Sequence, residues 1–170
     1  DPGKYAGSTG STICTLCPAG KAQLAANASA CVDCAAGTYN RNNGSVQCDL
    51  CPRGQFAATT GQAQCTPCSP GQFQIAIGQS SCALCPNGTV SQFPGRDTAC
   101  ELCPSGSYSA RPGQSQCTPC PRGQYQAETG RSNCQLCSVG QTTDDVGSNA
   151  CRACEAGKVS DLPGQPECLV

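Results

Sequence analysis

Cysteine is the residue of this chain whose type and spacing could do chemistry. Ten cysteines recur at a step of 17 residues, broken once by a step of 18, and nine of them open a C-x-x-C pair. Thiols in this pattern can form disulfides, bind zinc or exchange disulfides with another protein. The nine opening cysteines are Cys14, Cys31, Cys48, Cys65, Cys82, Cys100, Cys117, Cys134 and Cys151. Cys168 stands at the next position of the same step. The closing cysteines are Cys17, Cys34, Cys51, Cys68, Cys85, Cys103, Cys120, Cys137 and Cys154.

Zinc is the main rival to disulfides. Cys14-x-x-Cys17 followed by Cys31-x-x-Cys34 has the spacing of a four-cysteine zinc ribbon. Such sites would use the pairs two at a time, yet the chain has nine pairs and its pattern repeats every 17 residues rather than every 34. A redox-active C-x-x-C is a single motif at a helix start, unlike nine copies on turns. We therefore expect no metal and no other cofactor.

The composition favours a disulfide scaffold. Cysteine accounts for 19 of 170 residues, aromatic residues make up 4%, and the chain has neither Trp nor Met. A chain this poor in large apolar side chains cannot offset its conformational entropy by burial, so cross-links must replace a conventional core. Cytosolic thiols stay reduced, so the sequence predicts an extracellular or secreted protein.

Three pairing schemes fit a regular array. The closing cysteine of one pair can bond the opening cysteine of the next, each C-x-x-C can close on itself, or neighbouring pairs can interlock or hold a metal. The first scheme closes loops of about 15 residues, worth about 3 kcal/mol each in the chain-entropy model, whereas the second constrains very little. We favour the first scheme, with the others open. It pairs Cys17 with Cys31, Cys34 with Cys48, Cys51 with Cys65, Cys68 with Cys82, Cys85 with Cys100, Cys103 with Cys117, Cys120 with Cys134, Cys137 with Cys151 and Cys154 with Cys168.

This scheme leaves Cys14 without a partner in the chain. Residues 1–5 resemble those that elsewhere follow a closing cysteine, and the chain stops at Val170, before the closing cysteine due after Cys168. We therefore expect residues 1–170 to be one continuous repeat array from a longer chain, with Cys14 paired outside the segment or unpaired.

Each repeat carries two glycines and an aromatic residue at fixed places. The first glycine follows the closing cysteine by three residues, and an aromatic residue often stands two residues later. The second glycine precedes the next opening cysteine by four residues, as Gly10 does ahead of Cys14. Asn27 and Arg96 replace it in two repeats, and Asn is the residue that best tolerates a left-handed backbone after glycine. The first glycine predicts a positive φ or an approach too close for a Cβ, and Pro-x-Gly predicts a tight turn. We expect a short strand through the aromatic residue, a glycine turn, and a second short strand running into the opening cysteine.

The repeat at 85–100 is one residue longer than the others and contains Phe93, the one aromatic residue outside the regular slot. An inserted residue in a hairpin usually forms a bulge or a longer turn. It could alternatively mark a contact site.

Other function classes find little support. The chain has no histidine, and its adjacent carboxylates, Asp144 and Asp145, fall in an expected turn, so we do not expect an enzyme. A net charge of −1 without a basic stripe argues against nucleic acid as a partner. No apolar stretch approaches the length of a membrane span, and no signal peptide opens the segment. Three sequons predict N-glycosylation at Asn27, Asn43 and Asn87.

The pattern Cys-Pro-x-Gly-x-Tyr/Phe, with a cysteine fourteen positions after the first, resembles the ephrin-receptor-like cysteine-rich repeat. It is also similar to the single-disulfide module of tumour necrosis factor receptors. The repeats from Cys51, Cys103 and Cys120 match best. The resemblance implies an extracellular, elongated stalk and supports the bond of the Cys17–Cys31 type. Tumour necrosis factor receptors alternate this module with a second one that is missing here, which argues against a cytokine receptor. Uniform runs of this kind also resemble surface and filament proteins of unicellular eukaryotes.

Together these features predict a small disulfide-rich, mainly β and irregular fold, an elongated tandem array of about ten 17-residue hairpin repeats forming a solenoid-like rod. The favoured function is a rigid extracellular structural protein, glycosylated, in a cell-surface stalk or filament. Its expected partners are further copies of itself or other extracellular matrix and surface proteins. The alternative is a ligand-binding receptor-type ectodomain.

Overall fold

The computed structural model describes residues 1–8 and 13–170. Gly10, expected in the second-glycine slot, lies outside the described residues. The chain divides into two compact units, which we describe separately. The first unit contains Asp1–Ser69, Phe73–Ala83 and Pro94–Ala99. The second contains Pro70–Gln72, Leu84–Phe93 and Cys100–Val170.

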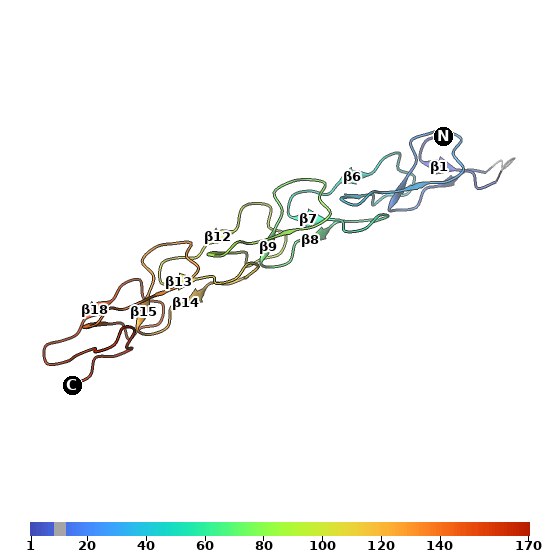
Figure 1. Cartoon of the computed structure of the whole chain (residues 1–170). Coiled ribbons are helices and arrows are strands. Elements are labelled where there is room, and N and C mark those ends of the chain that lie inside the picture. The colour runs from blue at the N-terminus through green and yellow to red at the C-terminus, as the bar shows by residue number, and fades with distance from the viewer. Residues whose placement is uncertain (9–12) are drawn as a thin grey trace. The chain divides into compact units, whose positions relative to one another are not determined.

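The regular structure of the described residues consists of two-residue β-strands joined by turns, and those residues form no helix (Figure 1). The first eight strands are β1 (Lys4–Tyr5), β2 (Thr15–Leu16), β3 (Lys21–Ala22), β4 (Val32–Asp33), β5 (Thr38–Tyr39), β6 (Asp49–Leu50), β7 (Gln55–Phe56) and β8 (Thr66–Pro67). They are followed by β9 (Gln72–Phe73) and β10 (Ala83–Leu84). The last eight are β11 (Thr89–Val90), β12 (Glu101–Leu102), β13 (Ser107–Tyr108), β14 (Thr118–Pro119), β15 (Gln124–Tyr125), β16 (Gln135–Leu136), β17 (Gln141–Thr142) and β18 (Arg152–Ala153).

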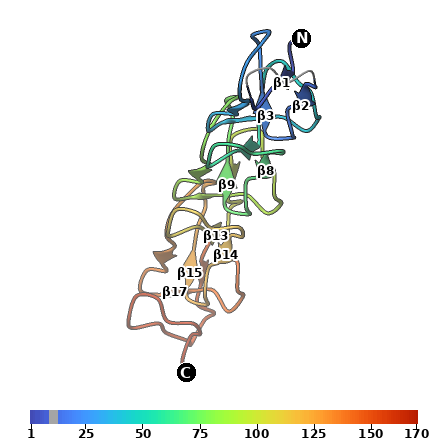
Figure 2. The same cartoon turned by 90° about the vertical axis from the view of Figure 1, so that its right-hand side faces the viewer.

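Consecutive strands pair as antiparallel hairpins with one register. In the first unit β1 pairs with β2, so that Tyr5 stands opposite Thr15 (Figure 2). In the second unit β13 pairs with β14, and Tyr108 stands opposite Thr118. A two-stranded hairpin is marginal in water by itself, so each one needs support from its neighbours and from a cross-link. The expected fold class, a disulfide-rich β and irregular tandem array, is confirmed.

The position of the second strand differs from our expectation. We placed it before the opening cysteine, but it lies between the two cysteines of each C-x-x-C, as β4 does between Cys31 and Cys34. The chain turns tightly at Pro18, whose carbonyl accepts a hydrogen bond from the Lys21 N–H at 3.1 Å. This turn brings Cys17 back beside Cys31, so the residues after Cys31 become the cross-strand partners of β3.

The backbone at both glycine slots is left-handed. In the repeat from Cys51 to Cys65, Gly54 and Gly61 both have φ of +75°. Asn27, which replaces the second glycine, has φ of +61°, and Asn is the residue that best tolerates this region after glycine. The expected positive φ is therefore confirmed at these positions. In the irregular repeat the slot falls on Gly95, with φ of +76°, and not on Arg96, because the inserted residue shifts the turn by one position.

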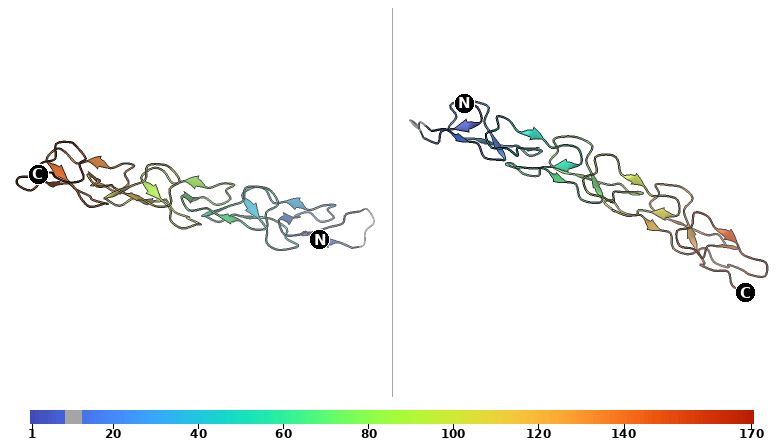
Figure 3. Two further views of the ribbon diagram at one scale, coloured as in Figure 1. Left: turned by 90° about the horizontal axis from the view of Figure 1, so that it is seen from below. Right: turned by 180° about the vertical axis from the view of Figure 1, so that it is seen from behind.

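The interior is made of sulfur and small side chains rather than aromatic rings. The closing cysteines from Cys17 to Cys137 are at most 1% exposed, whereas the aromatic residues beside the first glycines, such as Phe56, are only half-buried. Figure 3 draws short strands joined by loops, and the buried apolar residues of the described part of the chain are closing cysteines together with Ala22, Ala57 and Val90. Cross-links thus occupy the place that a hydrophobic core holds in other domains.

Candidate functional site

The structure brings together the cysteines that the favoured pairing scheme joins. Each closing cysteine is bonded to the next opening cysteine, with Cα–Cα distances of 5.6 to 5.8 Å, which lie within the range usual for disulfides. The bonds are Cys17–Cys31, Cys34–Cys48, Cys51–Cys65, Cys68–Cys82, Cys85–Cys100, Cys103–Cys117, Cys120–Cys134, Cys137–Cys151 and Cys154–Cys168. Cys14 is exposed and has no disulfide partner among the described residues. Three of the four cysteines of the candidate zinc ribbon therefore lie in disulfides.

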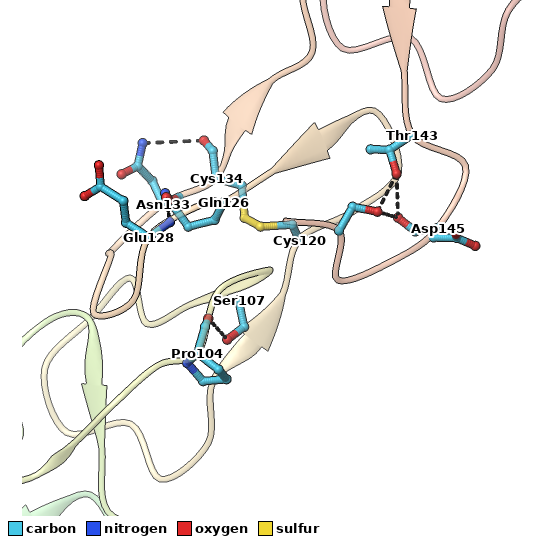
Figure 4. Close-up of a disulfide and its surroundings, with 10 residues drawn as sticks. Pro104, Ser107, Cys120, Gln126, Glu128, Asn133, Cys134, Thr143 and Asp145 are labelled. Atoms are coloured by element: carbon cyan, nitrogen blue, oxygen red, sulfur yellow. Dashed lines mark hydrogen bonds between the residues drawn. A yellow bond between two sulfur atoms is a disulfide. The ribbon is translucent and has the colours of Figure 1, made fainter. Parts of the chain in front are cut away.

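Figure 4 shows the Cys120–Cys134 disulfide among the polar contacts that surround it. The Ser107 hydroxyl donates to the Pro104 carbonyl at 2.8 Å, and the Glu128 N–H donates to the Gln126 side chain at 3.0 Å. These contacts lie in turns, where backbone groups would otherwise lack partners. The disulfide therefore sits among satisfied polar groups.

Backbone hydrogen bonds tie each repeat to the next one. The Gly106 N–H donates to the Gln126 carbonyl at 2.7 Å, the Cys120 N–H to the Gly106 carbonyl at 2.8 Å, and the Gly147 N–H to the Cys120 carbonyl at 2.8 Å. The same three bonds occur in the first unit, where Gly20 donates to the Asn40 carbonyl. Neighbouring repeats thus donate main-chain hydrogen bonds to each other.

Paired glycines hold each repeat against the next repeat but one. A Cβ on the first glycine would lie 2.0 to 2.2 Å from the carbonyl oxygen of the second glycine two repeats later, a distance that no real Cβ contact shows. The pairs in the first unit are Gly3 with Gly44, Gly20 with Gly61, Gly37 with Gly78 and Gly54 with Gly95. The pairs in the second unit are Gly71 with Gly113, Gly88 with Gly130, Gly106 with Gly147 and Gly123 with Gly164. Sequence reasoning predicted the close approach but missed its partner, because both slots repeat at the same period.

The strand between the two cysteines of a C-x-x-C places a leucine over a second glycine in several repeats. The Leu136 Cδ2 atom would lie 2.7 Å from a Cβ on Gly164, and Leu50 stands in the same way over Gly78. The second glycine is therefore covered on one side by a backbone and on the other by a side chain. Leu50 and Leu136 remain about half exposed at 54% and 55%, so they also contribute to the surface.

In six repeats the residue after the aromatic slot is buried and polar, a feature that sequence reasoning missed; these residues are Asn40, Ser91, Ser109, Gln126, Thr143 and Ser160. In one form its side-chain oxygen accepts from the N–H two residues later, as Gln126 does from Glu128 at 3.0 Å. In the other form the slot holds serine, and a glutamine five residues later supplies the oxygen. Gln114 accepts in this way both from the Arg111 N–H and from the Ser109 hydroxyl, each at 3.0 Å. The signal in the sequence is a slot that holds only Ala, Gln, Asn, Ser or Thr.

Two ion pairs lie near the end of the second unit. Arg152 bonds Asp144 at 2.8 Å, and Lys158 bonds Glu155 at 2.9 Å, around a surface hollow of about 220 Å³. The pKa of Asp144 is lowered, first by a backbone hydrogen bond at Asp144 and then by the Arg152 side chain. The hydrogen bond from Lys158 lowers the pKa of Glu155. These carboxylates stay ionised at neutral pH, so their arrangement does not provide a general acid.

The three sequon asparagines are all exposed. The Asn43 side-chain oxygen accepts from the Ala19 N–H at 3.0 Å, which leaves the side-chain nitrogen, the atom that carries an N-linked glycan, outside this bond. Phe93 in the irregular repeat is 72% exposed.

A family model described as tyrosine-protein kinase ephrin type A/B receptor-like matches four overlapping segments, residues 20–61, 54–98, 92–124 and 106–154. These segments cover more than half of the chain. The chain belongs to the ephrin-receptor-like family. Ephrin-receptor-like repeats are receptor-like, disulfide-rich modules and not an enzyme class, and together with the disulfides they indicate an extracellular location. No helix of the described residues has the length and apolarity that crossing a membrane requires. No curated protein matches the chain.

Proposed function

We propose that this chain is an extracellular structural repeat protein, a rigid disulfide-laddered rod within a cell-surface stalk or an extracellular filament. The observation that carries the proposal is the use of the repeated residues. Each disulfide closes one repeat, the buried polar side chain caps the turn of that repeat, and both glycines make backbone contacts with a repeat one or two places away. The residues that recur are therefore committed to holding the array rather than to forming a ligand site.

Mechanical resistance follows from the pairing of the sulfurs. Each disulfide spans 14 residues in most repeats, and its Cα atoms stay 5.6 to 5.8 Å apart. Under tension, the residues within a disulfide loop cannot extend, and those between loops can. At about 3.5 Å per extended residue, each fully pulled oxidised repeat would reach about a quarter of its length in the reduced chain. Such a chain suits a spacer that must bear load.

Glycans would complete the surface of such a spacer. The proposed sites are Asn27, Asn43 and Asn87, which are exposed. We expect enzymatic removal of N-linked glycans from material secreted by eukaryotic cells to lower its apparent mass, and Asn→Gln changes at the three sites to abolish that shift.

Electron microscopy and a binding screen on the purified glycoprotein test the proposal together. Filaments or extended particles that retain no soluble partner support the structural role. Discrete compact particles that bind a soluble partner with 1:1 stoichiometry would contradict it.

A receptor-type ectodomain is the second candidate, and Phe93 favours it. A phenylalanine that is 72% exposed in the one irregular repeat is an unusual surface residue for a protein with few aromatic residues. For a receptor-type ectodomain we expect Phe93→Ala to abolish binding of a soluble partner without changing stability. The control is Ile77→Ala, at a residue that is 54% exposed in a regular repeat, and it should leave binding intact.

A further inference from the structure

Two asparagines of the chain are followed directly by glycine, Asn43 by Gly44 and Asn87 by Gly88. An Asn-Gly bond is chemically labile, because glycine has no Cβ to hinder the attack of its main-chain nitrogen on the asparagine side chain. The other asparagines precede larger residues, as Asn149 precedes an alanine. Since both Asn43 and Asn87 are exposed, their reactivity depends on whether the two glycine nitrogens are available.

The reaction at such a bond is a rearrangement within the chain. At Asn43 the main-chain nitrogen of Gly44 would attack the Cγ atom, the Cγ–Nδ2 bond would break, and the side-chain amide would leave as ammonia with the proton of the main-chain N–H. Water then opens the resulting succinimide ring. Opening at the side-chain carbonyl gives aspartate, and opening at the main-chain carbonyl gives isoaspartate, whose main chain runs through the Cβ atom. Water is the only co-reactant.

The fold withholds both glycine nitrogens from this reaction. The Gly44 N–H donates to the Cys17 carbonyl at 2.7 Å, and the Gly88 N–H donates to the Ser109 carbonyl at 2.8 Å. Attack requires the nitrogen to face the asparagine Cγ atom at about 3–3.5 Å and to give up its proton. A nitrogen whose hydrogen is bonded to a neighbouring repeat cannot turn toward that side chain. The Asn43 side chain is also held, because its oxygen accepts from the Ala19 N–H at 3.0 Å.

The isoaspartate product would not fit the fold, because it adds a main-chain atom directly before the glycine. Gly88 is buried, and the Gly130 carbonyl oxygen lies 2.0 Å from the position that a Cβ on Gly88 would take. The carbonyl oxygen of Gly44 covers Gly3 in the same way, and the Leu16 Cδ2 atom would lie 2.7 Å from a Cβ on Gly44. A displaced main chain would lose these contacts, so a modified repeat could not regain its place in the array.

We propose that Asn43 and Asn87 are latent isoaspartate sites, protected while their repeats are closed and modified once a repeat opens. Each site lies within a disulfide loop of its own, Asn43 between Cys34 and Cys48 and Asn87 between Cys85 and Cys100. Reduction of that disulfide by a thiol would free the glycine nitrogen and allow a change that prevents reclosure. Reduction would thus become irreversible at these two repeats. The inference goes beyond the proposed structural function and does not depend on it.

Peptide mapping by mass spectrometry tests the protection. The oxidised full chain is produced without glycans in the bacterial periplasm, because a glycan would occupy the leaving nitrogen. It is compared with the same chain after reduction and alkylation, at one temperature and one mildly alkaline pH. We expect isoaspartate to form at Asn43 and Asn87 in the reduced chain and about tenfold or more slowly in the oxidised chain, with Asn149 slow in both. Equal rates in the two forms would overturn the inference, and so would a reduced chain in which both sites stay intact.

Two reciprocal variants test whether each disulfide loop protects its own site. Cys85→Ser with Cys100→Ser opens the repeat of Asn87, and Cys34→Ser with Cys48→Ser opens the repeat of Asn43. We expect each variant to form isoaspartate faster at its own site and to leave the other site as slow as in the oxidised parent. Equal rates at the two sites within both variants would contradict local protection.

Asn43→Gln combined with Asn87→Gln tests the irreversibility. Glutamine forms the corresponding ring much more slowly, because its side chain has an additional methylene. After incubation under a thiol reductant and then reoxidation, the parent should lose its thermal transition in proportion to its isoaspartate content, whereas the double variant should regain the transition. Equal recovery of the two proteins would show that the array tolerates isoaspartate and would overturn the irreversibility.

Discussion

The carbonyl oxygen of Gly147 lies 2.0 Å from the position that a Cβ of Gly106 would take. Two residues that are 41 positions apart in the sequence are thus in direct backbone contact. The contact joins a repeat to the next repeat but one, and it admits only glycine at the first position.

This contact predicts a large difference between two alanine substitutions. Gly106→Ala and Gly147→Ala both impose a left-handed alanine, which costs about 1–2 kcal/mol. Gly106→Ala adds a backbone clash, and overpacking typically costs a further 1–3 kcal/mol, about the same again. Thermal and denaturant unfolding of the oxidised proteins would measure both changes. Equal losses would mean that conformation alone selects glycine at this slot.

The disulfide between Cys120 and Cys134 closes a loop of 15 residues counting both ends, with a sequence separation of 14. Replacing both cysteines by serine should lower the free energy of unfolding by about 3 kcal/mol. Cys14→Ser should leave it unchanged, because Cys14 forms no disulfide in the structure. Peptide mapping of the non-reduced parent should recover the Cys120–Cys134 cross-link, and a bond between Cys117 and Cys120 would contradict the pairing.

Chelation and reduction should have opposite effects on the fold. A strong chelator should leave the thermal transition unchanged, because sulfurs joined in disulfides are not available as thiolate ligands. A reductant should abolish the transition, since the closing cysteines form the interior. Loss of structure with the chelator alone would restore the zinc hypothesis.

The buried Gln126 side chain, which accepts from the Glu128 N–H, allows a test in which a second substitution should restore some of the stability lost by the first. Gln126→Ser removes the oxygen that accepts from the Glu128 N–H and the amide that donates to the Asn133 carbonyl, so we expect a loss of about 1–3 kcal/mol. Adding Arg131→Gln reproduces the arrangement of Ser109 with Gln114 and should recover part of that loss. Unfolding curves of the single and double variants would show it, and a double variant no better than Gln126→Ser would refute the exchange of caps.

Arg152 lowers the pKa values of both Asp144 and Glu155, whereas Lys158 lowers that of Glu155 alone. Arg152→Gln should raise the pKa of Asp144 part of the way to its ordinary value, because the backbone hydrogen bond remains. Lys158→Gln should raise the pKa of Glu155 and leave that of Asp144 unaltered. Folded pKa values below the unfolded ones stabilise the fold at neutral pH, and this small stabilisation disappears as the pH falls through them. NMR titration of the side-chain carboxyl carbons would measure each shift.

The sequence predicted the local structure of each repeat well. The fixed spacing of cysteine, glycine and aromatic residues indicated hairpins, and the left-handed backbone followed from glycine at Gly54 and Gly61 and from Asn27 in the same slot. These features depend on a few neighbouring residues, and a local pattern determines them.

Contacts between repeats were harder to predict. A strict period aligns every repeat with every other, so it cannot show whether Gly106 meets the next repeat or the one after it. The second strand was misplaced because residues before and after an opening cysteine have similar propensities, and the turn at Pro18 decides between them. The buried polar slot was missed because Gln126 and Ser109 look like surface residues until their turn partners are known.

The equivalence of the glycine partners bears on how such chains change over generations. The eight glycine pairs are built alike, since in each one the first glycine lies under the carbonyl oxygen of the second glycine two repeats later. Any repeat with both glycines can therefore stand two places before any other such repeat. Duplication or loss of a whole repeat by recombination therefore leaves every remaining contact matched, and only the length of the array changes. Selection could adjust the reach of such a protein in steps of one repeat without refitting any interior residue.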